Sequence, residues 1–321
     1  MTPRRLATAA LAVTFAAALL GACTSATHGR SAAPAASTTA SPPSTSAPST
    51  SRPAATAQYY VSIGDSYAAG YQPTGAGTGG TTRNGFAYQL VPLAAARGYH
   101  LKLVNFGCSG ATTASVLKTA GCPAKDLGPG AAPYTATQAV AAEDFIRAHR
   151  AAIGLVTISL GGNDVTACGL SASPLTCLSD ALTRVKTNLA TLLTGLRSAG
   201  GTATRIVGIT YPDVLLAGSL TAIPAAKTIA TLSVTAFQSL INPALKATYA
   251  AAGAGFVDVT AATGAYGPLT ATTTLAPYGT IPVPVAKVCT LTYSCQYHDI
   301  HPRTAGYAII AGLIAAELPK R

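Results

Sequence analysis

The sequence predicts an α/β fold in which a parallel sheet is covered by helices on both faces. Short apolar runs rich in β-branched residues alternate along the chain with longer segments whose apolar residues recur at helical spacing. The short runs are almost continuously apolar, as strands buried on both faces are. Five strands are expected, at 59–63, 101–106, 153–160, 205–210 and 255–259.

Five helices are expected between and after these strands, at 86–97, 137–149, 182–198, 227–252 and 304–318. Gly200 and Gly201 should end the third helix. Pro243 should interrupt the fourth, because proline has no backbone N–H to donate.

The N-terminus resembles an export signal. Arg4 and Arg5 precede an apolar stretch, Leu6 to Leu20, that is too short to span a membrane comfortably. The stretch ends Leu20-Gly21-Ala22-Cys23, which looks like a bacterial lipobox, in which the cysteine is acylated. The alternative is an ordinary secretory signal. We expect a signal peptide at 1–22, lipidation at Cys23, and an extracellular protein anchored to the cell membrane by lipid.

A flexible tether is expected at 23–58. This stretch is almost entirely Ala, Ser, Thr and Pro, and it contains no acidic residue and no Val, Ile or Leu. Such a segment cannot bury enough apolar surface to offset its chain entropy. The remaining residues, 59–321, are enough for one α/β domain.

The charge distribution argues against nucleic-acid binding. The formal net charge is +11, but four of the 21 basic residues lie in the first 58 positions. The rest of the chain has no block of Lys and Arg and no aromatic residues interleaved with basic ones. We therefore expect no nucleic-acid partner, and a monomer whose mildly basic surface suits anionic lipid or wall polymer.

Seven cysteines fit an exported protein. With Cys23 assigned to lipid, six remain, and six allow 15 pairings. An oxidising compartment favours three disulfides. Proximity in the sequence suggests Cys108–Cys122, Cys168–Cys177 and Cys289–Cys295. A metal site is not expected, because the chain has no C-x2-C pair with adjacent histidine ligands.

Polar, glycine-rich sequences follow the first three predicted strands. They read Gly64-Asp65-Ser66-Tyr67, Asn105-Phe106-Gly107-Cys108-Ser109-Gly110 and Gly161-Gly162-Asn163-Asp164, and a fourth segment, His298-Asp299-Ile300-His301, stands near the C-terminus. In open α/β sheets, ligands bind beyond the carboxyl ends of the strands. A serine, exposed N–H groups, an amide and a histidine are the groups that acyl transfer needs.

These four segments, in this order, resemble the SGNH hydrolases, also called the GDSL esterase and lipase family. The resemblance spans Ser62 to Gly306. It implies a flavodoxin-like three-layer α/β/α sandwich with a five-stranded parallel sheet, and hydrolysis of carboxylic esters with no metal or organic cofactor. The lipobox and the six cysteines look most like those of secreted actinobacterial members.

The resemblance also implies a role for each matching residue. Ser66 would be the nucleophile and His301 the general base. The N–H groups of Ser66 and Gly110 and the amide of Asn163 would form the oxyanion hole.

Two positions depart from the family pattern. The family usually has an acid three residues before the histidine, and here that position is His298. Either Asp299 orients His301, or a backbone carbonyl does, which would make the site a dyad. Tyr67 stands where the family name expects leucine, at a position outside the chemistry.

Each of these residues also has a purely structural interpretation. Ser66 could cap the next helix, Asn163-Asp164 could form an Asx turn, and His301 could cap the last helix. Asp65 is expected to brace its turn rather than to react. Convergence of all the segments at one sheet edge favours the catalytic interpretation.

The favoured function is that of an esterase or lipase, with a small-molecule or lipid ester as substrate and an acyl-enzyme on Ser66. Two alternatives stay open: a glycan O-acetylesterase, and a non-catalytic cell-surface binding module. The stretch 75–80 is expected to be a flexible flap beside Ser66. Tyr67, Tyr71 and Tyr88 either line an acyl pocket or pack in the core.

Overall fold

The computed structural model describes residues 57–321, except 167, 169–170 and 172. The predicted signal peptide, Cys23 and nearly all of the predicted tether lie outside the described residues. Within the described part, no helix is both long enough and apolar enough to cross a membrane.

The central sheet has five parallel strands in the order β4-β1-β5-β6-β7. Their bounds are Gln58–Gly64 (β1), Leu101–Asn105 (β4), Ile153–Ser159 (β5), Ile206–Ile209 (β6) and Gly255–Val257 (β7). All five predicted strands are confirmed. If the five strands are numbered 1 to 5 along the chain, their order in the sheet is the flavodoxin-like 2-1-3-4-5. Strands are added on one side of β1 first and then on the other, so the order switches between β1 and β5. A ligand site is therefore expected beyond the ends of these two strands.

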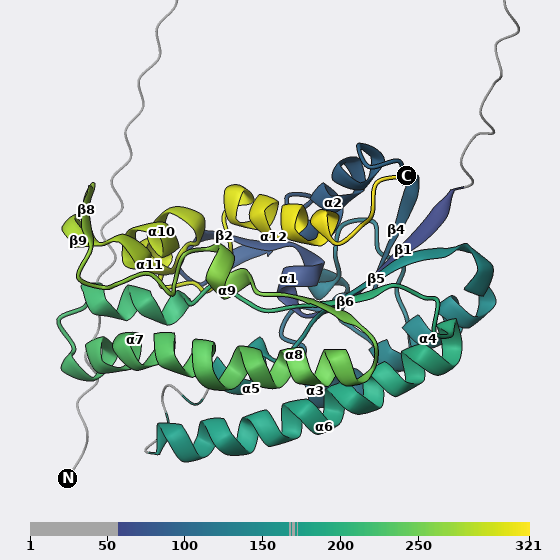
Figure 1. The fold of residues 1–321 in the computed structure, drawn as a ribbon, viewed down its shortest axis with the longest axis horizontal. Coiled ribbons are helices and arrows are strands. Elements are labelled where there is room, and N and C mark those ends of the chain that lie inside the picture. Colours follow the sequence, from purple (N-terminus) through teal and green to yellow (C-terminus); the bar gives the residue numbers. More distant parts are fainter. Residues whose placement is uncertain (1–56, 167, 169–170, 172) are drawn as a thin grey trace, which may run out of the picture. The chain divides into compact units, whose positions relative to one another are not determined.

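Helices cover both faces of the sheet and form an α/β/α sandwich (Figure 1). One face carries α2 (Phe86–Ala95) and α12 (Thr304–Ala316); the other carries α3 (Thr113–Lys118), α4 (Gln138–Ala148), α6 (Pro174–Gly200) and α8 (Asn242–Ala251). The alternation of strand side chains separates the two cores. In β1, Val61 and Ile63 pack toward α4 and α6, whereas Tyr60 packs toward α2 and α12.

Two of the predicted helices differ from the structure, one in its start and the other in its continuity. The third begins at Pro174, well before the predicted start, because proline suits the first turn of a helix. The fourth comprises α7 (Pro224–Ala236), a π-helical turn at η5 (Phe237–Ile241), and α8. Pro243 lies in the first turn of α8, so the predicted interruption is a change in hydrogen-bonding pattern rather than a break.

Several short elements were not predicted. Two are hairpins, β2 (Tyr71–Gly75) with β3 (Thr78–Thr81), and β8 (Thr272–Leu275) with β9 (Gly279–Pro282). The first hairpin contains the stretch 75–80 for which a flap was expected. The others are α1 (Ser66–Ala69), α5 (Gly162–Thr166), α9 (Val259–Ala262), α10 (Val283–Leu291), α11 (Ser294–Tyr297), and the 3-10 segments η1 (Ala124–Asp126), η2 (Arg150–Ala152) and η4 (Val214–Leu220).

The three disulfides suggested by sequence proximity are confirmed. Cys108 pairs with Cys122, Cys168 with Cys177, and Cys289 with Cys295. Each closes a short loop, of which the longest joins cysteines 14 positions apart. The disulfides therefore hold loops in place around a sheet that has its own core.

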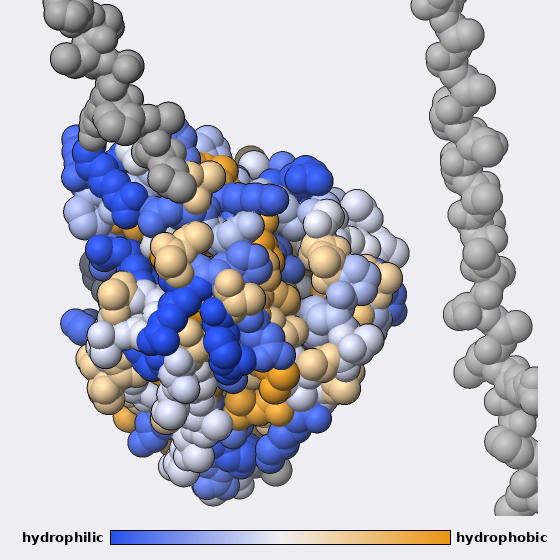
Figure 2. Space-filling view, turned by 90° about the vertical axis from the view of Figure 1, so that its right-hand side faces the viewer, coloured by the Kyte–Doolittle hydropathy of each residue, from blue (hydrophilic) through white to orange (hydrophobic). Residues whose placement is uncertain are grey.

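The end of the domain opposite β8 and β9 has a mixed surface. Seen from the right-hand side of Figure 1, hydrophilic residues are interspersed with small hydrophobic areas (Figure 2). Such scattered apolar side chains are normal for a protein surface.

We predict that Gly208→Ala destabilises the fold. A Cβ at Gly208 of β6 would lie 2.1 Å from the ring of the fully buried Tyr249. Overpacking of this kind typically costs 1–3 kcal/mol, or about 2 kcal/mol here. Gly312→Ala is the matched control, because this exposed position in α12 has no atom within 4 Å of a new Cβ. Alanine should stabilise that helix by up to about 1 kcal/mol. Urea unfolding checks both, and equal unfolding free energies for the two variants would contradict the prediction.

Candidate active site

Ser66 lies at the turn between β1 and α1. A Cβ at Gly64, whose φ is +150°, would lie 2.4 Å from the carbonyl oxygen of Ser159, so only glycine fits there. The carboxylate of Asp65 accepts a hydrogen bond of 2.9 Å from the Tyr67 N–H and caps α1. Ser66 is the first residue of α1 and is not its cap. Its hydroxyl is therefore available for other interactions.

The side chains of Ser66 and His301 are hydrogen-bonded, with 2.7 Å between Oγ and Nε2. On the other side of the ring, Nδ1 lies 2.6 Å from Oδ1 of Asp299, which also accepts the backbone N–H of His301 at 2.9 Å. A carboxylate only accepts hydrogen bonds, so this contact assigns the ring proton to Nδ1. Nε2 is then free to accept the proton of the Ser66 hydroxyl.

The carboxyl group of Asp299 is held in its charged form. Burial alone would raise its pKa, but hydrogen bonds from the ring and the backbone of His301 outweigh burial and lower the pKa below its ordinary value. His298 is exposed, in a left-handed conformation with φ of +54°, and does not line the cavity beside Ser66. Of the two partners expected for His301, Asp299 and a backbone carbonyl, the structure places Asp299 against the imidazole.

Three candidate hydrogen-bond donors lie in the segments that follow β1, β4 and β5. Within the described residues, the backbone N–H groups of Ser66 and Gly110 have no hydrogen-bond acceptor. The side-chain amide of Asn163 donates one hydrogen to the carbonyl of Ala111 at 2.8 Å, which brings it next to Gly110 and leaves its second hydrogen free. Asn163 and Ser66 line the same cavity. These are the donors that the family resemblance implies for an oxyanion.

Asp164 has a different role from Asn163. Its carboxylate accepts hydrogen bonds from the N–H and the hydroxyl of Thr113, at 2.9 and 2.6 Å. The carboxylate thus connects α5, which follows β5, to the start of α3, rather than closing a local Asx turn.

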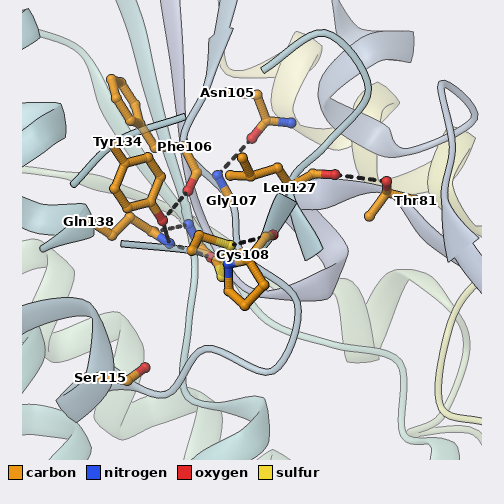
Figure 3. Close-up of a disulfide and its surroundings, with 12 residues drawn as sticks. Thr81, Asn105, Phe106, Gly107, Cys108, Ser115, Leu127, Tyr134 and Gln138 are labelled. Atoms are coloured by element: carbon orange, nitrogen blue, oxygen red, sulfur yellow. Dashed lines mark hydrogen bonds between the residues drawn. A yellow bond between two sulfur atoms is a disulfide. The ribbon is translucent and has the colours of Figure 1, made fainter. Parts of the chain in front are cut away.

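The loop that carries Gly110 is braced at several points (Figure 3). Oδ1 of Asn105 accepts the Gly107 N–H at 2.9 Å, and the Tyr134 hydroxyl donates to the carbonyl of Phe106 at 3.1 Å. A Cβ at Gly107 would lie 2.7 Å from that of Ala68, so glycine allows α1 to approach this loop closely. The Cys108–Cys122 disulfide fixes the same loop covalently.

Tyr67 connects the Ser66 helix to the His301 loop. Its buried hydroxyl donates to the carbonyl of Ile300 at 2.7 Å, next to His301. The hydrogen bond between Tyr67 and Ile300 was not predicted from the sequence. The one hint of it was the tyrosine at position 67, where the family name expects leucine. The ring of Tyr71, in β2, lies 4.4 Å from the imidazole of His301, measured between centroids. Tyr88 instead donates to the carbonyl of Pro129 and does not line the cavity beside Ser66.

Asp65 is fully enclosed beneath the site. Burial raises the pKa of its carboxyl group to about 6, although hydrogen bonds from the Tyr211 hydroxyl and the Tyr67 N–H favour the charged form. Ser159 also donates to it, at 3.3 Å. These contacts confirm the expectation that Asp65 braces the turn.

A cavity of about 710 Å³ opens beside Ser66. It is lined by the strand-end turns and by side chains of α5, α6, η4, α7, η5 and α8.

Among the described residues, no group of three or more His, Cys, Asp or Glu side chains is arranged to hold a metal ion.

The chain thus combines a five-stranded flavodoxin-like sandwich with a hydrogen-bonded row of serine, histidine and aspartate beyond the ends of its strands. The chain belongs to the GDSL-like lipase/acylhydrolase family, whose model matches residues 62–309. Membership of this family supports hydrolysis of ester bonds as the general class of activity.

Solved structures with a similar fold include several hydrolases. An extracellular lipase from Streptomyces rimosus is 19% identical, with a TM-score of 0.47, and the match covers 81% of this chain and 98% of the lipase. An aryl esterase of M. smegmatis is 14% identical (TM-score 0.45; 81% and 97% covered), and a carbohydrate esterase is 12% identical (TM-score 0.38; 81% and 67% covered). No curated protein sequence matches the chain.

We predict a pH-dependent contribution to stability from Asp213, which follows β6 next to the cavity. Burial raises the pKa of its carboxyl group to about 7 from an ordinary 3.8, although Ser233 donates a hydrogen bond of 2.7 Å to it. Between these two pH values the folded protein binds more protons at this site than the unfolded chain, so rising pH lowers the free energy of unfolding. Asp213→Asn should make that decline shallower, leaving the part due to Asp65 and Glu143, whose pKa values burial also raises.

Urea unfolding at intervals between pH 4 and pH 8 measures this effect. The variant should gain stability relative to the native chain as the pH rises. A decline as steep in Asp213→Asn as in the native chain would show that the Asp213 carboxyl does not titrate in this range.

Proposed function

We propose that this protein hydrolyses carboxylic esters through a covalent acyl-enzyme on Ser66. The observation that carries the proposal is the hydrogen-bonded row of Ser66, His301 and Asp299, with successive distances of 2.7 and 2.6 Å. This row supplies a nucleophile, a base within reach of its proton, and a carboxylate that orients the base.

In the first step, Nε2 of His301 takes the hydroxyl proton while Oγ of Ser66 bonds to the ester carbonyl carbon. The carbonyl oxygen becomes negative, and the N–H groups of Ser66 and Gly110 and the amide of Asn163 are proposed to bind it. Removing one such donor typically costs about 10²–10³ in kcat. His301 then gives its proton to the alcohol as the ester C–O bond breaks, leaving the acyl group on Ser66.

In the second step, water attacks the acyl carbon. His301 takes a proton from the water, and the same donors stabilise the second negative oxygen. The proton then returns to Oγ of Ser66 as the acyl bond breaks and the carboxylic acid leaves. Throughout, Asp299 keeps the ring proton on Nδ1 and stabilises the imidazolium.

The structure weakens the case for a non-catalytic binding module. The best support for that interpretation is the absence of an acid at position 298. The Asp299 carboxylate, only two residues before His301, nevertheless reaches Nδ1. The absence of an acid at 298 therefore does not leave His301 without a carboxylate partner.

The proposal extends to cellular location. The sequence Leu20-Gly21-Ala22-Cys23 and the tether that follows it support export and anchoring of the enzyme to the outside of the cell membrane by lipid on Cys23. The three disulfides fit an oxidising compartment.

The decisive variant is Ser66→Ala. The native chain should hydrolyse p-nitrophenyl acetate, and the variant should lose nearly all of that activity, since no other group there can form the acyl-enzyme. Release of p-nitrophenol measures the rate, and urea unfolding verifies that the variant is folded. Full activity in Ser66→Ala would refute the proposal, and so would a folded native chain that hydrolyses no p-nitrophenyl ester of any acyl-chain length.

Asp299→Asn tests the third member of the row. An asparagine favours the wrong imidazole tautomer, so kcat should fall steeply, by up to about 10⁴, as it does in Ser-His-Asp enzymes. His298→Gln is the control: the side chain of His298 is exposed, whereas the ring of His301 is hydrogen-bonded to Asp299, so this variant should keep the native kcat. A loss below about tenfold in Asp299→Asn would mean that the row functions as a dyad.

A further inference from the structure

The helices on the side of α6 leave a groove between α6 and α7. The helix α6 packs against α8, and α7 packs against η4 and η5, but α6 and α7 make little contact with each other. Leu178 of α6 and Ile229 of α7 line the same cavity as Ser66 and Asn163. A group bonded to Ser66 would therefore have this groove beside it.

The described lining of the groove is predominantly apolar. Leu175, Leu178, Leu182 and Val185 lie three or four positions apart and form one stripe along α6. The facing apolar side chains come from η4, α7 and η5: Val214, Leu215, Ile229, Leu232, Phe237 and Leu240. The one charged side chain in the described lining is Asp65, which is buried beneath Ser66 and hydrogen-bonded to Tyr211.

The rim of the groove exposes large apolar side chains. Leu175 is 68% exposed, Leu232 52% and Leu240 50%. In the described part of the chain, six large apolar side chains are exposed, and these three belong to the groove. Apolar surface gathered in this way marks a site for an apolar ligand.

We propose that the groove binds the acyl chain of the substrate and that the enzyme prefers esters of medium-length or long straight-chain acids. This inference rests on the proposed function, because Ser66 fixes where the acyl carbon must lie. A cavity of about 710 Å³ has the size of sites that enclose whole drug-sized ligands, and an acetyl group would leave most of it unfilled. Each methylene removed from water can raise kcat/KM by up to about fourfold until the groove is full.

The first test is a chain-length series measured with the native full-length chain. The substrates are the acetyl, butyryl, octanoyl and decanoyl esters of p-nitrophenol, each below its solubility limit. We expect kcat/KM to rise from the acetyl to the octanoyl ester. A value that is equal or lower for octanoyl than for acetyl overturns the proposal.

The second test uses a matched pair of substitutions on α7. Thr228 and Thr231 are both exposed, and both donate to the carbonyl four residues earlier, but only Thr228 lines the groove. Thr228→Trp should narrow the groove and lower octanoyl activity at least tenfold relative to acetyl activity, whereas Thr231→Trp should leave the ratio unchanged. Leu178→Asp, which places a charge on the α6 side, should have the same effect as Thr228→Trp. If both groove variants keep the native ratio, the acyl chain binds elsewhere.

The outcomes separate this inference from the proposed function. Acetyl ester hydrolysis that depends on Ser66, with no increase in kcat/KM for longer acyl chains, would support the proposed esterase function. The same result would refute acyl-chain binding in the groove. It would also favour a deacetylase acting on glycans. If the folded native chain hydrolyses none of the esters, both proposals fail.

Discussion

The hydrogen bond between Ser66 and His301 is the interaction on which the interpretation of this molecule depends. It joins the end of the first strand to a loop 235 residues later in the chain. Its length of 2.7 Å requires that β1, α1 and the C-terminal loop be fixed relative to one another. Tyr67 contributes to this, because it is anchored in the buried core by its ring and bonds to Ile300 through its hydroxyl.

The parallel sheet explains why the chemical groups meet. All five strands point their carboxyl ends toward one edge, and the order reverses between β1 and β5. Ser66 follows β1, Asn163 follows β5 and Gly110 follows β4, so the residues proposed as nucleophile and oxyanion donors follow three adjacent strands. Close approach at this edge depends on glycine, since side chains at Gly64 and Gly107 would collide with Ser159 and Ala68. The polar groups beneath the site are satisfied largely by one another, as the contacts of Asp65 illustrate.

The strands and the convergence of the site were predictable because they follow from local sequence. A strand buried on both faces has a nearly continuous apolar run, and each polar motif lies directly after such a run or near the C-terminus. The contact between Asp299 and His301 could not be decided from spacing, because the family pattern has the acid three residues before the histidine and Asp299 stands only two before it. The β2–β3 hairpin was missed because its Gly- and Thr-rich strands lack an apolar alternation. The groove was missed because the separation of α6 and α7 is a property of tertiary packing.

In the proposed mechanism, His301 activates Ser66 as a nucleophile. Labelling with an alkyl fluorophosphonate tests it directly, because the serine oxygen displaces fluoride and keeps the phosphonyl group. Mass spectrometry of the digested protein should find the adduct on the peptide that contains Ser66, and His301→Ala should slow its formation severely. An unlabelled Ser66 in the folded native chain, or equally fast labelling in His301→Ala, would contradict the account.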